Sequence, residues 1–190
     1  MALDRQVAEL RGRGDLEGAA TLAIRTLGPE ILGYLTALLH HPGDASEVFS
    51  QFAEDLWRGL GGFRGEASLR TWAYRLARHA ALRHRRDPYR RRGERLGTTR
   101  ASVLAGSIVA STAVRLEQRA EQLNRLRARL AEEEQTLLIL RVDRGLSWGD
   151  VAEVLAGEDG KQPEEAALRK RFERLKEKLA RAAREEGLIE

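Results

Sequence analysis

Residues 63–78 have the sequence FRGEASLRTWAYRLAR, in which a short loop leads into a helix. Ser68 is a typical N-cap, because its hydroxyl can accept a hydrogen bond from a backbone N–H of the first helical turn. The apolar residues that follow are spaced as on one face of a helix: Leu69, Trp72, Ala73, Leu76 and Ala80. We therefore predict a glycine-containing loop and then an amphipathic helix, which ends near Arg86 before Asp87-Pro88.

The other face of this helix is predicted to be basic, with Thr71, Tyr74, Arg75, Arg78 and Arg85 exposed and His79 at its edge. Between Arg70 and Arg95 the acidic residues are only Asp87 and Glu94, so the local field attracts a polyanion. Aromatic and arginine side chains together bind single-stranded nucleic acid by stacking and charge, which makes Trp72 and Tyr74 candidates for base contacts. The alternatives are a solvated arginine-rich surface and a purely structural Trp72. We expect Trp57 and Trp148 to be core residues.

Helical periodicity extends to both sides of this segment. Towards the N-terminus we expect a short helix over residues 1–13, a helix capped by Asp15, a break at Gly28-Pro29, a new helix from Pro29, and a further one capped by Asp44. Residues 88–113 are first basic and then small and nearly uncharged, which indicates a flexible or only partly helical linker.

A second group of helices follows the linker. Two apolar helices precede a turn at Gly145-Leu146-Ser147, and Ser147 is expected to cap a short helix up to Leu155. Pro163 is expected to open a last helix whose outer face is basic. This order is typical of a helix-turn-helix unit, with an ordinary charged helical hairpin as the alternative. We predict an all-α fold of two small helical domains, 1–87 and 114–190, joined by the linker 88–113, with the helix-turn-helix in the second domain.

Several functional classes fit the sequence poorly. The 190 residues include no cysteine, the N-terminal segment holds charged residues rather than an apolar signal core, and the longest uncharged run is too short to span a bilayer. The histidines and glycines do not have the spacing of a metal site or a phosphate-binding loop. We therefore expect a soluble cytoplasmic protein that is not an enzyme, has no catalytic residue, metal or cofactor, and does not insert into a membrane.

Taken together, the motifs resemble the extracytoplasmic-function (ECF) group of sigma-70 factors. The resemblance rests on the segment 63–78, the order of Gly14–Glu17, Gly28–Leu35 and Asp44–Phe49 before it, and the segments Leu146–Leu155 and Arg169–Phe172 near the end. It implies a subunit that binds core RNA polymerase and promoter DNA, with an anti-sigma factor as a further partner that the family allows.

The resemblance also implies roles for individual residues. The polymerase clamp would bind Asp44, Glu47, Gln51 and Asp55. The minus-ten element would be melted and bound by Phe63, Arg64, Gly65, Ser68, Thr71, Trp72, Arg75, Arg78 and His79. The minus-thirty-five element would be bound by Arg169, Lys170, Arg171, Glu173 and Arg174.

The chain departs from the family pattern at three places. Ser46 interrupts the acidic run, His79 stands where asparagine is frequent, and the loop 156–163 is long. Two alternatives therefore remain open: a free-standing helix-turn-helix regulator, and a sigma-like module that binds polymerase without promoter activity.

Overall fold

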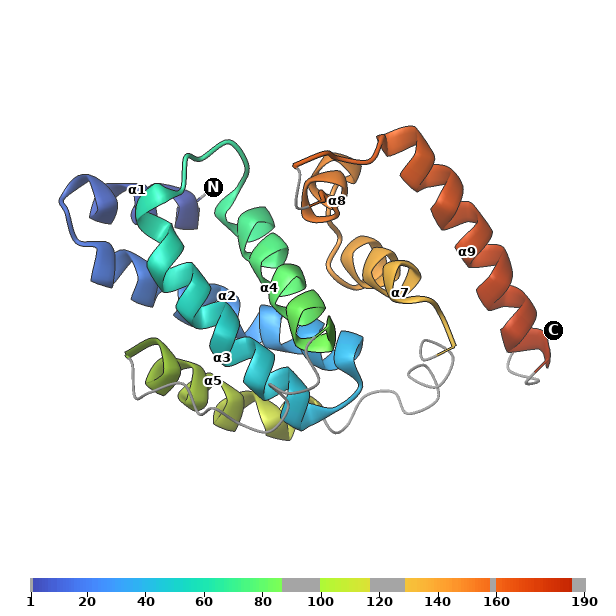
Figure 1. The fold of residues 1–190 in the computed structure, drawn as a ribbon, viewed down its shortest axis with the longest axis horizontal. Coiled ribbons are helices and arrows are strands. Elements are labelled where there is room, and N and C mark those ends of the chain that lie inside the picture. The colour runs from blue at the N-terminus through green and yellow to red at the C-terminus, as the bar shows by residue number, and fades with distance from the viewer. Residues whose placement is uncertain (1, 87–99, 117–128, 158–159, 186–190) are drawn as a thin grey trace. The chain divides into compact units, whose positions relative to one another are not determined.

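The computed structural model describes residues 2–86, 100–116, 129–157 and 160–185. In this part of the chain there are eight α-helices and no strand, so the all-helical prediction is confirmed. Contacts divide the chain into two compact units, Met1–Gln118 and Arg119–Glu190, each of which is described by itself (Figure 1).

Unit 1 is built around the long helix α2 (Leu16–Leu39), which follows α1 (Ala2–Gly12). The cap predicted at Asp15 is confirmed, since its side chain accepts a hydrogen bond of 2.8 Å from Gly18 N–H. The break predicted at Gly28-Pro29 is wrong, because Pro29 lies inside α2. Proline inside a helix costs about 3 kcal/mol. Buried residues on both sides of it, such as Leu27 and Ile31, offset that cost by tertiary packing.

By length and composition α2 is apolar enough to cross a membrane. More than half of the apolar window that meets this criterion is buried within the fold, however, where α2 packs against α1, α3, α4 and α5. Its hydropathy therefore reflects its position as the core helix of unit 1.

The next helices are α3 (Pro42–Gly59), the short 3-10 turn η1 (Leu60–Gly62) and α4 (Leu69–Arg86). His41, not Asp44, caps α3: its Nδ1 accepts a hydrogen bond of 3.2 Å from Asp44 N–H, and Asp44 lies in the first turn. Pro42 causes this shift, since proline suits the first position of a helix and so places the cap one residue before it.

The buried face of α4 also differs from the prediction. Thr71 and Tyr74, expected on the exposed face, are buried, whereas Trp72 is half-buried. The core stripe consists mainly of small residues, Ala73, Ala77, Ala80 and Ala81, which let α4 approach its neighbours closely. The predicted stripe favoured the large apolar side chains, because a hydrophobicity pattern weights a residue by its apolar size. It does not show how closely small residues let two helices approach each other.

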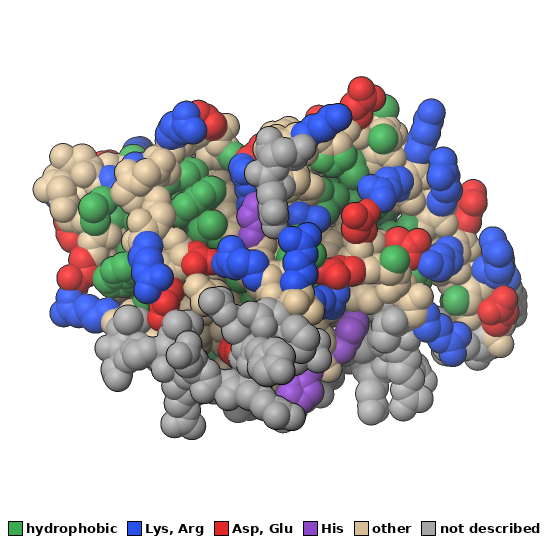
Figure 2. All heavy atoms as spheres, in the orientation of Figure 1, with side chains coloured by type: hydrophobic (Ala, Val, Ile, Leu, Met, Phe, Trp, Pro, Cys, Tyr) green, Lys and Arg blue, Asp and Glu red, His purple; other side chains and the backbone are tan. Residues whose placement is uncertain are grey.

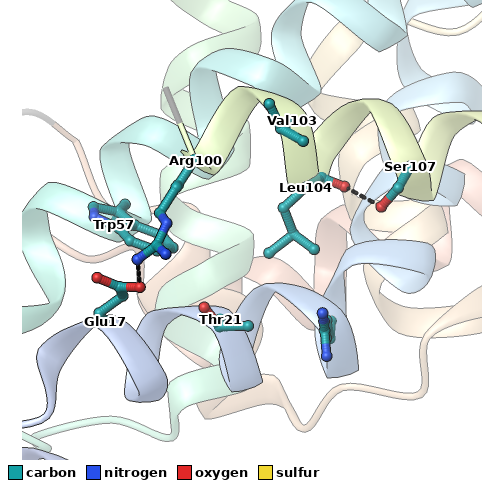
Figure 3. Close-up of a pocket in the computed structure, with 8 residues that line it drawn as sticks. Glu17, Thr21, Trp57, Arg100, Val103, Leu104 and Ser107 are labelled. Atoms are coloured by element: carbon teal, nitrogen blue, oxygen red, sulfur yellow. Dashed lines mark hydrogen bonds and ion pairs between the residues drawn. The ribbon is translucent and has the colours of Figure 1, made fainter. Parts of the chain in front are cut away.

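Helix α5 (Arg100–Leu116) occupies part of the segment expected to be a linker. It packs against both α2 and α3, and Figure 1 shows it on the side of this pair away from α4. Ile108 packs against Gly28. A Cβ atom added to Gly28 would lie 2.6 Å from the Cδ1 atom of Ile108. An open pocket remains between α5 and α2, with Arg100 paired to Glu17 at one end (Figure 3). The remaining linker residues, 88–99, lie outside the described part of the chain.

Unit 2 contains α7 (Glu132–Leu138), which continues as the wider helical turn η3 (Ile139–Asp143), then α8 (Trp148–Val154) and α9 (Glu165–Glu185). Gly145 turns the chain with a φ of 63°, and Ser147 caps α8 as predicted by accepting a hydrogen bond of 3.1 Å from Asp150 N–H. Leu130, Leu138 and Leu175 form a small core, with Phe172 and Leu179 packed against it. Most of the first of the two apolar helices predicted before the turn, with its stripe from Leu116 to Leu130, lies outside the described residues.

Candidate nucleic-acid interface

The loop between η1 and α4 presents a pair of aromatic rings. The Phe63 and Trp72 ring centroids are 4.9 Å apart with an interplanar angle of 33°, and both side chains are half-buried. Arg64, exposed beside them, lies 3.5 Å from Glu66, and Gly65 turns the chain with a φ of 76°. The loop therefore offers π surface and a cation at the surface of unit 1, which suits an unpaired base.

Serine and threonine fix the start of α4 after this loop. Ser68 Oγ accepts a hydrogen bond of 3.0 Å from Thr71 N–H, and the Ser68 and Thr71 hydroxyl oxygens are 2.7 Å apart. The cap predicted at Ser68 is confirmed. Thr71 is buried behind it, so its position suits support of the loop rather than direct contact with a ligand.

Two residues of α1 hold this loop, and sequence reasoning missed both. Arg11 donates a hydrogen bond of 3.1 Å to the Gly61 carbonyl, and its guanidinium carbon lies 5.8 Å from the centre of the Phe63 ring. Asp4 Oδ1 accepts a hydrogen bond of 2.7 Å from Leu69 N–H. Burial acts to raise the pKa of Asp4, but the Leu69 N–H helps to lower it below its ordinary value. Asp4 and Arg11 are seven residues apart in the sequence, which corresponds to two helical turns. This spacing was the signal in the sequence that the two residues share one face of a helix.

The basic face of α4 is shorter than the sequence suggests, because Arg70 and Tyr74 interact within the fold. Arg70 binds the Glu30 carboxylate through Nε and Nη2, and the Tyr74 hydroxyl donates to Glu30 at 2.8 Å. The hydrogen bond with Glu30 raises the pKa of Arg70, which therefore keeps its charge. Tyr74 also packs edge to face on Tyr34, so the proposed base contact by Tyr74 is wrong.

Arg75, Arg78 and His79 are half-buried on α4. Arg75 and His79 follow Trp72 by three and seven positions, which places them on the same face as the aromatic pair. A nucleic-acid strand that stacks on Phe63 and Trp72 would next meet Arg75 and His79 along this face.

Asp44, Glu47, Gln51 and Asp55 form one stripe along α3, with spacings of three and four residues. Two basic residues of α4 contact it. Arg83 pairs with Asp55, and the buried His84 ring lies with Nε2 3.6 Å from Asp44 and Nδ1 3.9 Å from Glu47. Gln51 donates a hydrogen bond of 2.9 Å to Asp55. Glu47 is the most exposed carboxylate of the stripe.

In unit 2, lysine and arginine side chains cover much of the surface over α9 (Figure 2), and they differ in their ion pairs. Arg171 pairs with Glu133 at 2.6 Å and Lys178 with Glu134 at 2.7 Å, so both tie α9 to α7. The hydrogen bond with Lys178 lowers the pKa of Glu134. Lys170 and Arg174, four positions apart and exposed, form no ion pair with the residues that the structure describes. Arg169 pairs with Glu165 of its own helix, and Glu173 with Lys176.

Trp148 is half-buried rather than a core residue as predicted. Its ring lies 4.9 Å from the guanidinium of Arg141, 6.0 Å from that of Arg169, and edge to face with Phe172. The Trp148 side chain thus links η3, which holds Arg141, to α9. Trp57 is likewise half-buried and lines the pocket under α5.

Across the described residues no cluster of three or more histidine, aspartate or glutamate side chains could hold a metal ion. The surfaces of both units instead combine aromatic rings with basic side chains. These features indicate a helical protein that binds nucleic acid.

Comparison with known proteins places the chain in a family. The model of sigma-70 region 2 matches residues 23–92, a range that includes α3, η1, α4 and the Phe63–Trp72 pair. RNA polymerase sigma factor YlaC of Bacillus subtilis is 31% identical over 130 residues, which cover 66% of this chain and 73% of that protein. The RNA polymerase sigma-H factor of Pseudomonas aeruginosa is 29% identical over 159 residues, which cover 80% of this chain and 82% of that protein.

The chain therefore belongs to the sigma-70 family of RNA polymerase sigma factors. The resemblance inferred from the sequence is confirmed. Sigma factors act by binding and not by catalysis, in agreement with the prediction that the chain is not an enzyme. Unit 1 comprises only 118 of the 190 residues, so the match to the sigma-H factor extends into unit 2.

Proposed function

We propose that this chain is a promoter-specific sigma factor of the ECF group, which binds core RNA polymerase in the cytoplasm and directs promoter recognition, melting and initiation. The observation that carries the proposal is the half-buried Phe63–Trp72 pair, formed between the loop and α4 within the range matched by sigma-70 region 2. A promoter-melting protein needs such a surface, because an unpaired base leaves the duplex stack only if another surface receives it.

Unit 1 binds the melted minus-ten element in this proposal. Removing a base from the stack costs a few kcal/mol, and stacking on an aromatic side chain returns about 1–3 kcal/mol per base. Phe63 and Trp72 supply the stacking surface, with Arg64, Gly65 and Ser68 around it and Thr71 supporting Ser68 from behind. Arg75, Arg78 and His79 then bind the backbone of the captured strand.

The α3 stripe binds the polymerase clamp in this proposal. Asp44, Glu47, Gln51 and Asp55 present acidic and amide groups on one helical face, which suits a basic partner. Their contacts with Arg83 and His84 orient the stripe before binding. Glu47 is the exposed member and is expected to contribute most to the docking rate.

Unit 2 is a helix-turn-helix domain in this proposal, with α9 in the major groove of the minus-thirty-five element and α8 bracing it. Lys170 and Arg174 are exposed and unpaired within the described residues, so they are the first candidates for phosphate or guanine contacts. Arg169 and Glu173 are the neighbouring candidates. Arg171 is engaged with Glu133, which favours a bracing role. An anti-sigma factor that covers these surfaces is a further partner in keeping with the family.

The experiment is to mix the purified chain with core bacterial RNA polymerase, separate the mixture by size exclusion, and assay transcription from genomic fragments. Co-elution with discrete start sites is the expected result, and mapping the starts gives both promoter elements. Co-elution without transcripts would favour the polymerase-binding module. Sequence-specific duplex binding without co-elution would favour the free-standing regulator and overturn the proposal.

A further inference from the structure

The loop between η1 and α4 is held at both ends by side chains from α1. Arg11 reaches the Gly61 carbonyl in η1, just before the loop, and Asp4 reaches the Leu69 N–H at the first residue of α4, just after it. The two contacts join segments that are 50 and 65 residues apart in sequence. The path of the loop therefore depends on a helix that precedes the range matched by sigma-70 region 2.

Arg11 is committed to this contact. Its guanidinium faces the ring of Phe63, which in turn packs against Trp72, so the three side chains form a row. Its Nε is buried and forms no hydrogen bond with the described residues, which places it inside the fold rather than towards a phosphate. A cation over an aromatic ring is attracted by the negative face of the ring, more strongly the further the pair is desolvated.

Asp4 acts on the helix that follows the loop. Leu69 is the first residue of α4, and its N–H is one of those that have no partner within the helix. A carboxylate at a helix N-terminus satisfies that donor and interacts favourably with the helix dipole. Asp4 thereby fixes where α4 begins, three residues before Trp72.

We propose that α1 is a positioning element for base capture, in which Arg11 and Asp4 hold residues 61–69 so that Phe63 and Trp72 form a surface for an unpaired nucleobase before DNA arrives. This inference rests on the proposed function. A surface that is ordered in advance does not spend binding free energy on ordering the loop, so α1 raises the affinity for the flipped base without contacting it.

The first test measures the loop in the free full-length chain by hydrogen exchange. Arg11→Ala and Asp4→Ala are expected to speed exchange in peptides that cover residues 60–69 by roughly tenfold, which corresponds to about 1.4 kcal/mol of local opening. Arg13→Ala is the matched control, because Arg13 is exposed beyond the end of α1. Unchanged exchange in both variants would overturn the proposal that α1 holds the loop.

The second test measures promoter opening by the holoenzyme on a promoter mapped as described above, with 2-aminopurine at the minus-ten positions as the probe of flipping. Arg11→Ala is expected to lower the opening equilibrium about tenfold, a loss of about 1.4 kcal/mol, with core-polymerase affinity unchanged. Arg11→Lys, which keeps the cation and a donor, is expected to restore most of the loss.

Each outcome decides the inference. Faster loop exchange with wild-type opening would overturn the role of α1 in base capture. A loss that Arg11→Lys does not restore would also overturn it, since the cation would then not be the cause. Failure of the wild-type chain to bind polymerase would overturn the proposed function and this role together, while the exchange data would still decide whether α1 holds the loop.

Discussion

The two units carry candidate nucleic-acid-binding surfaces of different construction. In unit 1 the candidate surface is an aromatic pair held by contacts from distant segments, including Arg11 of α1. In unit 2 it is one helix whose Lys170 and Arg174 form no ion pair within the described part of the chain, above a small core of Leu130, Leu138 and Leu175. An unpaired base needs a preformed apolar surface, whereas duplex phosphates need charges that reach out from a rigid helix. The comparison suggests that unit 1 supplies opening and unit 2 supplies attachment.

The largest expected effect comes from removing the stacking surface of unit 1. Trp72→Ala is expected to reduce promoter opening by a factor of roughly 10 to 100, because base–aromatic stacking is worth about 1–3 kcal/mol per base. The measurement is abortive transcription from a mapped promoter. Trp57→Ala is the matched control, since Trp57 is equally half-buried but lines the pocket under α5. Equal losses in the two variants would remove the case for a special role of Trp72.

The next effect concerns the network that supports unit 1. Glu30→Ala leaves Arg70 and the Tyr74 hydroxyl without their shared partner, and is expected to lower the free energy of unfolding by about 2 kcal/mol. Chemical denaturation followed by circular dichroism measures it. Glu9→Ala removes an exposed carboxylate 3.7 Å from Arg5 and is expected to change stability by less than about 0.5 kcal/mol. A comparable loss in both variants would contradict the assignment of Glu30 as a structural centre.

The charges of unit 2 are expected to act through salt dependence. The double substitution Lys170→Ala and Arg174→Ala is expected to lower the slope of log affinity against log salt by about 2, because each phosphate contact contributes about 0.9. Arg171→Ala is the matched comparison, since Arg171 pairs with Glu133 and its loss is expected to leave the slope nearly unchanged. Fluorescence anisotropy of the holoenzyme with a labelled minus-thirty-five duplex gives both slopes. If Arg171→Ala lowers the slope as much as the double variant, the distinction between Arg171 as a bracing residue and Lys170 and Arg174 as DNA contacts is wrong.

The smallest expected effect is the response of unit 2 to acid. The pKa of Glu134 lies below its ordinary value because Lys178 binds the carboxylate, so the folded state holds its proton less tightly than the unfolded state. This stability is therefore present above about pH 4.3 and is lost as the pH falls through the folded-state pKa.

Glu134→Gln is expected to remove roughly 0.5 kcal/mol of stability at neutral pH and to flatten its acid dependence. Hydrogen exchange of α9 between pH 3 and 6, corrected for intrinsic rates, measures it. Glu177→Gln is the control, because Glu177 is an exposed residue of α9. An unchanged acid dependence in Glu134→Gln would show that the contact with Lys178 does not stabilise unit 2.

Local signals in the sequence were sufficient for several elements of the fold. The caps at Asp15, Ser68 and Ser147 depend only on neighbouring residues, and the structure has all three. The uninterrupted α2 was missed, because the tertiary packing that retains Pro29 is absent from a local pattern. The sequence allowed a partly helical linker but did not show that α5 packs into unit 1, because α5 is stabilised by α2 and α3 and not by its own weakly amphipathic sequence.

The candidate sites show the same limit. The composition of α4 and α9 indicates basic faces, but the sequence alone does not reveal which cations are engaged within the fold. Arg70 and Arg171 pair with Glu30 and Glu133, which lie 40 and 38 residues away. Arg11 was overlooked for the same reason, since its partner Gly61 is brought near only by the fold.

The most direct test of the division between opening and attachment compares two variants on two templates of one mapped promoter, a duplex and a template mismatched over the minus-ten element. We expect the mismatched template to restore much of the activity of Trp72→Ala, since melting no longer limits it. The Lys170→Ala and Arg174→Ala variant is expected to stay impaired on both templates and to recover at low salt. Equal losses on both templates, with the same salt dependence in the two variants, would contradict the account.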